Sequence, residues 1–180
     1  MMMNRKLQNL NSYKISFALL ASLFLSLCIN AQEIKLYGNG EVLGRIDGGA
    51  FVGPGVGIET TIGNHFTFNA DVMTGFHEKG SITQFRPAVH YYFSKEQKGF
   101  FVGPSFKYTR FAEKNNLDIY DDTIYSVGLT LGLKSHFKEN FSFIISTAPH
   151  YAVGASTNPG KIALGSIEGL GFNIGLGYRF

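Results

Sequence analysis

The last fourteen residues, 167–180, constrain this chain more than any other stretch does. From Leu170 onward every second residue is large and apolar, and the residues between them are small or polar. The apolar positions are Leu170, Phe172, Ile174, Leu176, Tyr178 and Phe180. A period of two is typical of a β-strand with one apolar and one polar face. The chain therefore ends in an amphipathic strand whose last residue is aromatic.

Seven earlier segments alternate in a similar way: 33–41, 51–61, 66–76, 81–93, 100–111, 123–137 and 141–151. The glycines between positions 38 and 49 predict a loop or bulge after the first segment. Short turns at 63–65, 94–99 and 138–140 alternate with connections that include two long ones, at 112–122 and 152–165. Bacterial outer-membrane barrels have short turns on one side and longer loops on the other. The sequence thus predicts an all-β fold, an eight-stranded antiparallel up-and-down transmembrane β-barrel.

Alternation alone does not say which face lies inside, because a soluble lipocalin-like barrel turns its apolar face inward. Three features favour the membrane barrel. The apolar face is too bulky for the narrow interior of eight strands. Charged residues make up only 16% of the chain, below the roughly 25% of soluble domains. Aromatic residues gather at the strand ends, as in interfacial girdles; they are Phe66, Tyr91, Tyr92, Phe93, Phe100, Phe101, Phe137, Phe141, Tyr178 and Phe180.

Residues 1–31 have the pattern of a cleaved secretory signal peptide, which leaves 32–180 as the barrel domain. Three basic residues precede an apolar run of about 15 residues, shorter than the roughly 20 that a membrane-spanning helix needs. A single-pass anchor and lipidation at Cys28 are the alternatives. Without this segment 13 basic residues face 13 acidic ones, so the predicted domain is near neutral and no nucleic-acid partner is expected.

The chain resembles small outer-membrane β-barrel proteins of the OmpA/OmpX-like kind over residues 33–180, and the end of its signal is similar to exported proteins of Bacteroidota-type bacteria. The resemblance depends most on the C-terminal strand. It implies localisation in the bacterial outer membrane, contact with outer-membrane lipids, and recognition by the barrel-assembly machinery through that strand. The residues that match this assembly signal are Phe172, Ile174, Leu176, Tyr178 and Phe180.

If the apolar face is outside, a set of charged residues points into the lumen: Glu59, Asp71, Arg86, His90, Lys107 and Arg179. Buried charges require partners. We therefore expect a network in which Arg86 and Lys107 face Glu59 and Asp71. Such a network either holds the barrel closed or gates a narrow conduit, and the first interpretation is favoured because eight strands leave little room for water.

No catalytic, cofactor or metal site is expected. Ester cleavage needs a nucleophile, a base and an orienting acid. His150 with Ser146 or Ser156, and Glu168, are the nearest candidates, but the His-x-Ser-Asn pattern of lipid A deacylases is absent. Asp118, Asp121 and Asp122 do not have the spacing of an EF-hand calcium loop.

These observations favour a monomeric, non-enzymatic outer-membrane barrel with a structural, adhesion or interaction role through its extracellular loops. A lipid A-modifying barrel enzyme and a soluble barrel that binds a hydrophobic ligand are the alternatives.

Overall fold

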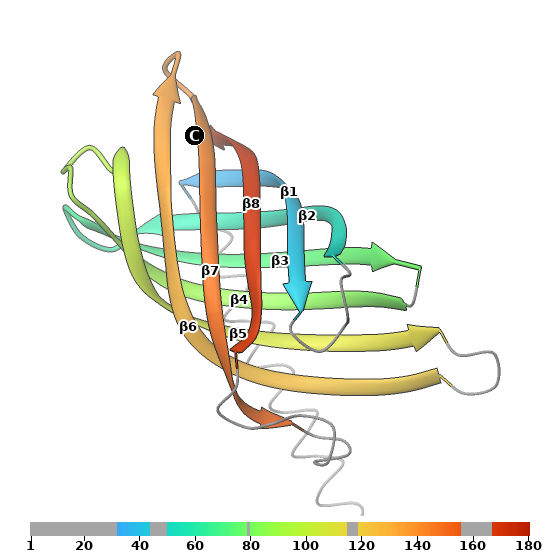
Figure 1. Ribbon diagram of the computed structural model, residues 1–180. Helices are drawn as coiled ribbons and strands as arrows, with labels where there is room; N and C mark the ends of the chain where they lie inside the picture. Colours follow the sequence, from blue (N-terminus) through green and yellow to red (C-terminus); the bar gives the residue numbers. More distant parts are fainter. Residues whose placement is uncertain (1–31, 44–49, 79, 115–118, 156–166) are drawn as a thin grey trace, which may run out of the picture. The chain divides into compact units, whose positions relative to one another are not determined.

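The computed structural model describes residues 32–43, 50–78, 80–114, 119–155 and 167–180. Eight strands follow one another: β1 (Glu33–Leu43), β2 (Ala50–Thr61), β3 (Phe66–His77), β4 (Gly80–Tyr92), β5 (Gly99–Lys114), β6 (Ile119–Phe137), β7 (Phe141–Ala155) and β8 (Ile167–Arg179). Each pairs antiparallel with its neighbours in sequence, and β8 pairs with β1 to close the barrel (Figure 1). The predicted eight-stranded up-and-down barrel is confirmed. In the described part of the chain, no helix has the length and apolarity needed to span a bilayer. The predicted signal peptide lies outside the described residues.

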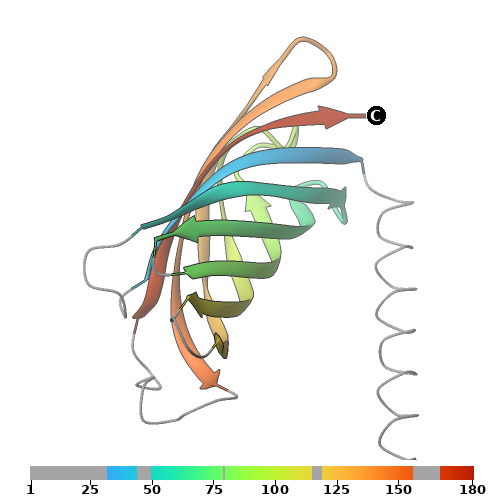
Figure 2. The same ribbon diagram turned by 90° about the vertical axis from the view of Figure 1, so that its right-hand side faces the viewer.

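The closing ladder runs from Glu33 opposite Arg179 to Leu43 opposite Gly169. The amide of Phe180 also donates to the carbonyl of Gln32 at 3.0 Å, so the C-terminus lies beside the start of β1 (Figure 2). We call this the near end of the barrel, together with the turns at 62–65, 93–98 and 138–140, and the opposite end the far end. A closed sheet has no unpaired edge, so that its backbone groups are satisfied without water.

The wall is apolar outside and polar inside. Large apolar side chains are exposed on the outer face of every strand, for example Leu36 (62%), Leu129 (50%) and Ile174 (55%). Their sequence neighbours point into the lumen and are buried. Water on the outside would make this arrangement costly, whereas lipid makes it favourable. The soluble alternative with an apolar interior is therefore wrong.

The exposed aromatic residues at the near end form two runs of ring contacts. Phe66, Tyr91, Phe93 and Phe100 make one run, with centroid distances of 5.2, 5.4 and 5.7 Å. Phe137, Phe141, Tyr178 and Phe180 make the other, at 5.8, 5.3 and 5.3 Å. Tyr92 and Phe101 were expected in this girdle, but both are 1% exposed and lie in the lumen. Successive residues of a strand point to opposite faces, and Tyr92 and Phe101 each follow an outward-facing aromatic residue, so both point inward.

Three loop predictions were too long. Gly38 and Gly40 lie within β1, and β7 continues to Ala155. In the predicted loop 112–122, β5 extends to Lys114 and β6 begins at Ile119, paired from Arg110 opposite Thr123 to Lys114 opposite Ile119. Most of residues 112–122 are polar, so the regular alternation with apolar residues is lost there. Strands beyond the bilayer do not need an apolar outer face, and the ladder continues without one.

Candidate functional site: a charge-balanced lumen

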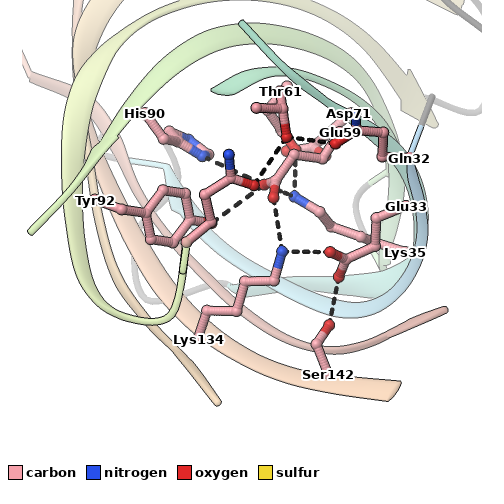
Figure 3. Close-up of polar contacts among 12 residues, drawn as sticks. Gln32, Glu33, Lys35, Glu59, Thr61, Asp71, His90, Tyr92, Lys134 and Ser142 are labelled. Atoms are coloured by element: carbon pink, nitrogen blue, oxygen red, sulfur yellow. Dashed lines mark hydrogen bonds and ion pairs between the residues drawn. The ribbon is translucent and has the colours of Figure 1, made fainter. Parts of the chain in front are cut away.

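At the near end the lumen contains an ionic cluster centred on Glu59 (Figure 3). Lys35 Nζ lies 2.5 Å from Glu59 Oε2 and also donates to Asn69 Oδ1 at 2.5 Å. Lys134 Nζ donates to Glu59 Oε1 at 2.6 Å, and the Tyr92 hydroxyl donates to Glu59 Oε2 at 3.2 Å. The Glu59 carboxylate is thus held by two ammonium groups and a phenol, which together compensate its removal from water.

Lys134 joins this cluster to the first strand. Its ammonium group also contacts the carboxylate of Glu33, which accepts a hydrogen bond from Ser142 on β7. The same ammonium group lies 5.7 Å from the centre of the Tyr92 ring. One lysine side chain on β6 therefore bridges carboxylates on β1 and β2 across the lumen. The cluster joins both strands of the β1–β2 hairpin to the opposite wall.

A second layer lies further along the lumen. Arg86 Nη2 lies 2.9 Å from Asp71 Oδ2, and the two residues are directly paired on β3 and β4. With the oxygen of its amide facing Arg86, Asn173 accepts from both Nη atoms at 3.2 and 3.1 Å and donates to Asn39 at 3.0 Å. This layer therefore also connects β8 and β1 to the wall opposite them.

A third ion pair lies closer to the far end. Lys107 Nζ contacts Glu41 Oε1 at 2.6 Å, and both side chains are at most 3% exposed. Near them, Ser105 Oγ is 3.0 Å from His150 Nε2, and His150 Nδ1 is 3.0 Å from the carbonyl of Ala148.

The strand charges buried in the described lumen balance. Four carboxylates, Glu33, Glu41, Glu59 and Asp71, face four cations, Lys35, Arg86, Lys107 and Lys134. Every one of these eight groups has at least one partner of opposite charge within 4.0 Å. A neutral, paired network avoids the cost of an isolated buried charge.

Five of the six lumenal residues named from the sequence, Glu59, Asp71, Arg86, His90 and Lys107, are buried in the lumen. The expected grouping differs in detail. Arg86 pairs with Asp71, but Lys107 contacts Glu41, and Glu59 is held by Lys35 and Lys134. His90 Nδ1 is 4.0 Å from Glu59. The exception is Arg179, which is only partly buried at the near rim.

Sequence reasoning missed Glu33, Lys35, Glu41 and Lys134 as members of the network. The sequence did indicate them, because each occupies a position that alternates onto the polar, inward face of its strand. Glycines on the facing strand make room for the β1 side chains. A Cβ atom at Gly177 would lie 2.0 Å from Glu33 Oε1, at Gly175 2.4 Å from the Tyr37 ring, and at Gly171 2.6 Å from Glu41 Oε2.

The two ends of the lumen are occupied differently. At the far end, Phe51 and Ile82 are fully buried and pack with Phe111, whose ring meets that of Phe51 edge-on at 5.7 Å. At the near end, Gln97 is 8% exposed; it accepts from the Thr61 hydroxyl at 2.9 Å and donates to the carbonyl of Gly63. Apolar side chains thus occupy the far end of the lumen, whereas at the near end Gln97 lies beside a pocket that Gln32, Thr61 and Arg179 also line.

Of the catalytic groups considered above, His150 and Ser146 are described, and they are not in contact. His150 contacts Ser105 rather than Ser146, and a backbone carbonyl, not an acid, meets its second nitrogen. Ser146 lies 3.3 Å from the amide of Asn173. The structure does not describe Ser156 and Asp118, nor the side chains of Glu168, Asp121 and Asp122. In the described residues, no group of three His, Cys, Asp or Glu residues is placed to hold a metal ion.

Solved structures with this fold are outer-membrane barrels. The N-terminal β-barrel domain of Pseudomonas aeruginosa OprF superimposes with a TM-score of 0.56 at 14% identity, covering 83% of this chain and 98% of that one. Neisserial surface protein A (NspA) gives 0.58 at 12% identity, with coverages of 82% and 95%. The outer membrane protein OprG from Pseudomonas aeruginosa gives 0.53 at 13% identity, with coverages of 84% and 97%. These identities establish the fold.

The apolar outer wall and this fold together make the chain an outer-membrane-type β-barrel, in agreement with the predicted localisation in the bacterial outer membrane. No curated protein matches the sequence. A family model described as "Protein of unknown function (DUF3575)" matches residues 17–158, a range that ends before β8. The chain therefore belongs to the DUF3575 family, and it has the fold of the small eight-stranded outer-membrane barrels.

Proposed function

We propose that this protein is a monomeric, non-enzymatic barrel of the outer membrane that has a structural, adhesion or interaction role through its far-end hairpins. In the orientation that we propose, the near end of the barrel faces the periplasm and the far end faces the cell exterior. The observation that carries the proposal is the network of paired charges across the lumen. Eight paired charges, with Gln97 on one side and the Phe51–Ile82–Phe111 cluster on the other, leave the hairpins as the part available to partners.

The β5–β6 hairpin is the best candidate for such contacts. Its ladder continues to Lys114 opposite Ile119, whereas the ladder between β6 and β7 ends at Ile124 opposite Ala155. The hairpin thus extends five residue pairs beyond the last pairing with β7 (Figure 1). On its other side β5 stays paired with β4 as far as Glu113 opposite Gly80, so β6 is the free edge of this extension. A paired extension from a rigid barrel presents side chains to the outside at little entropic cost.

A hairpin exchange tests the role. Phe111 and Asp122 are directly paired, so an Asn-Gly turn can replace residues 112–121 without a change of register. The control variant carries Lys138→Ser and Glu139→Ser in the near-end turn. For each variant, we would measure the folded band in the outer-membrane fraction by its heat-dependent gel mobility, and the retention of cells on a surface coated with extracellular matrix protein.

An interaction role predicts that the shortened hairpin lowers retention severalfold at an unchanged level of folded barrel, while the control retains cells normally. A structural role predicts that deletion of the whole gene, but not the shortened hairpin, sensitises cells to detergent. Normal retention and normal detergent resistance in the deletion strain would refute both roles. Mass spectrometry of lipid A from that strain tests the non-enzymatic assignment, for which we expect an unchanged acyl pattern.

A further inference from the structure

One charged side chain breaks the rule that strand charges point into the lumen. Among the strand residues whose side chains are described, Arg110 on β5 is the only charged one that points away from the barrel axis. An arginine in the middle of the lipid-facing wall costs about 2–4 kcal/mol, whereas one at the interface costs about 0–1 kcal/mol. Its position therefore marks the level of the lipid headgroups on the far side.

The residues around Arg110 support this level independently. Arg110 is paired with Thr83 on β4 and with Thr123 on β6, and these three outward-facing residues form a polar row across three strands. Two residues nearer the membrane centre, the same three strands carry a row of aromatic residues, Phe85, Tyr108 and Tyr125. The Tyr108 and Tyr125 rings are 5.6 Å apart. An aromatic row below a polar row is the arrangement found at a membrane interface.

The inside of the wall changes character at the same level. Ile82 and Phe111 are directly paired one residue beyond the polar row, and they face inward with Phe51 in an apolar cluster. Ile124 is 1% exposed and also faces inward. Toward the near end the lumen contains the ion pairs described above, together with a cluster of Tyr37, Tyr92, Phe101 and Ile144. An apolar interior under a polar exterior is the arrangement of a barrel wall in water. On β4 and β5 the wall is therefore polar outside and apolar inside at Arg110 and Phe111, as expected where this part of the barrel leaves the bilayer.

We propose that the row Thr83–Arg110–Thr123 is a binding site for the phosphate group of an outer-leaflet lipid. The guanidinium group supplies a planar set of donors that matches phosphate geometry, and the two threonines supply hydroxyl donors at either side. The acyl chains of the same lipid would lie along the aromatic row and the apolar wall below it. The partner is thus an amphiphile with its phosphate at the level of Arg110, for which the phosphorylated glycolipid lipid A is the probe.

The inference depends on the proposed membrane placement and not on the interaction role of the hairpins. Its test uses the full-length mature barrel purified in a maltoside detergent. Native mass spectrometry would measure the binding of lipid A and of the same lipid A after enzymatic removal of its phosphates. The variants are Arg110→Gln, Arg110→Lys, and Lys98→Gln as a control cation in the near-end turn. Heat-dependent gel mobility of each sample shows whether the variant is folded.

We expect the wild type to prefer phosphorylated lipid A, and Arg110→Gln to weaken its binding about tenfold because charge-assisted hydrogen bonds are lost. Arg110→Lys keeps the charge but not the planar donor set, so a loss of about threefold is expected. Lys98→Gln should bind like the wild type. The site would be overturned if the wild type bound the two lipids equally, or if a folded Arg110→Gln bound lipid A like the wild type. An equal loss of binding in Lys98→Gln would also overturn it. Absence of the wild type from the outer-membrane fraction would instead overturn the membrane placement.

Discussion

Substitution of Lys134 by methionine provides the most direct test of the lumenal network. The side chain of Lys134 is fully buried, and its ammonium group contacts both Glu33 and Glu59. Methionine keeps most of the volume and removes the charge. The cluster is then left with two carboxylates and a single lysine, Lys35, so that one buried negative charge has no cation to balance it.

The magnitude follows from the geometry. At 2.6 Å and an effective dielectric constant of about 20, one Lys134–Glu59 contact corresponds to roughly 6 kcal/mol of Coulomb energy. Part of this energy offsets desolvation, and removal of one partner from a buried pair typically costs about 3–5 kcal/mol. We expect Lys134→Met to lower the free energy of unfolding by about that amount. A double variant that adds Glu33→Gln restores neutrality and should recover at least half of the loss.

Urea unfolding of the barrel in lipid vesicles, followed by heat-dependent gel mobility, measures both effects. With a denaturant dependence of about 2 kcal/mol per molar urea, the single variant should shift the midpoint down by roughly 1.5–2.5 M. The surface pair Lys98–Glu96 is the control, since Lys98→Gln removes an ion pair in water and should leave the midpoint unchanged. The reasoning would be refuted if Lys134→Met stayed within about 1 kcal/mol of the wild type, or if the double variant were less stable than the single one.

Three further predictions concern the wall. A Cβ at Gly103 would lie 1.7 Å from the carbonyl oxygen of Val89, so Gly103→Ala should lower the refolded fraction in vesicles. A Cβ at Gly40 would have nothing within 4 Å, so Gly40→Ala should refold like the wild type. Equal refolding yields of the two variants would contradict the packing argument. Leu129→Arg places a charge on the lipid-facing wall between the two interfaces and should destabilise the barrel by about 2–4 kcal/mol in urea titrations, and a neutral result would argue against lipid on that face. Deletion of Phe180 should reduce the heat-modifiable band in the outer-membrane fraction relative to total protein, if this residue contributes to recognition by the assembly machinery; an unaltered ratio would remove that role.

The strands were predictable because the bilayer imposes a two-residue period on the wall. Where the wall faces lipid, as at Leu170–Phe180, the apolar parity is unbroken and the predicted strand agrees with β8. Beyond the bilayer this requirement ends. Past Arg110 most residues of β5 and β6 are polar and no longer alternate with large apolar residues, so their sequence resembles a loop although the ladder continues through them.

The partners in the lumen were not predictable to the same degree. Asp71 and Arg86 lie directly opposite each other on consecutive strands, so adjacency alone favours their pairing. Glu33 and Lys134 are 101 residues apart and meet across the lumen. Their contact depends on strand tilt and on the stagger between strands, which the closure of the barrel determines. Local alternation contains no information on either quantity.

The glycines of the last strand connect these observations. On β8 the outward positions are large, whereas the inward positions Gly171, Gly175 and Gly177 leave space that Glu41, Tyr37 and Glu33 of β1 occupy. A serine or alanine there would push against the first strand, because a Cβ at these glycines lies 2.0–2.6 Å from its side chains. The pairing of β8 with β1 therefore closes the wall and inserts the β1 acids among the lumenal cations in the same step. Because the acids lose water only when their cations are within reach, the desolvation cost and its compensation arise together, which favours a single closed state over a partly open barrel.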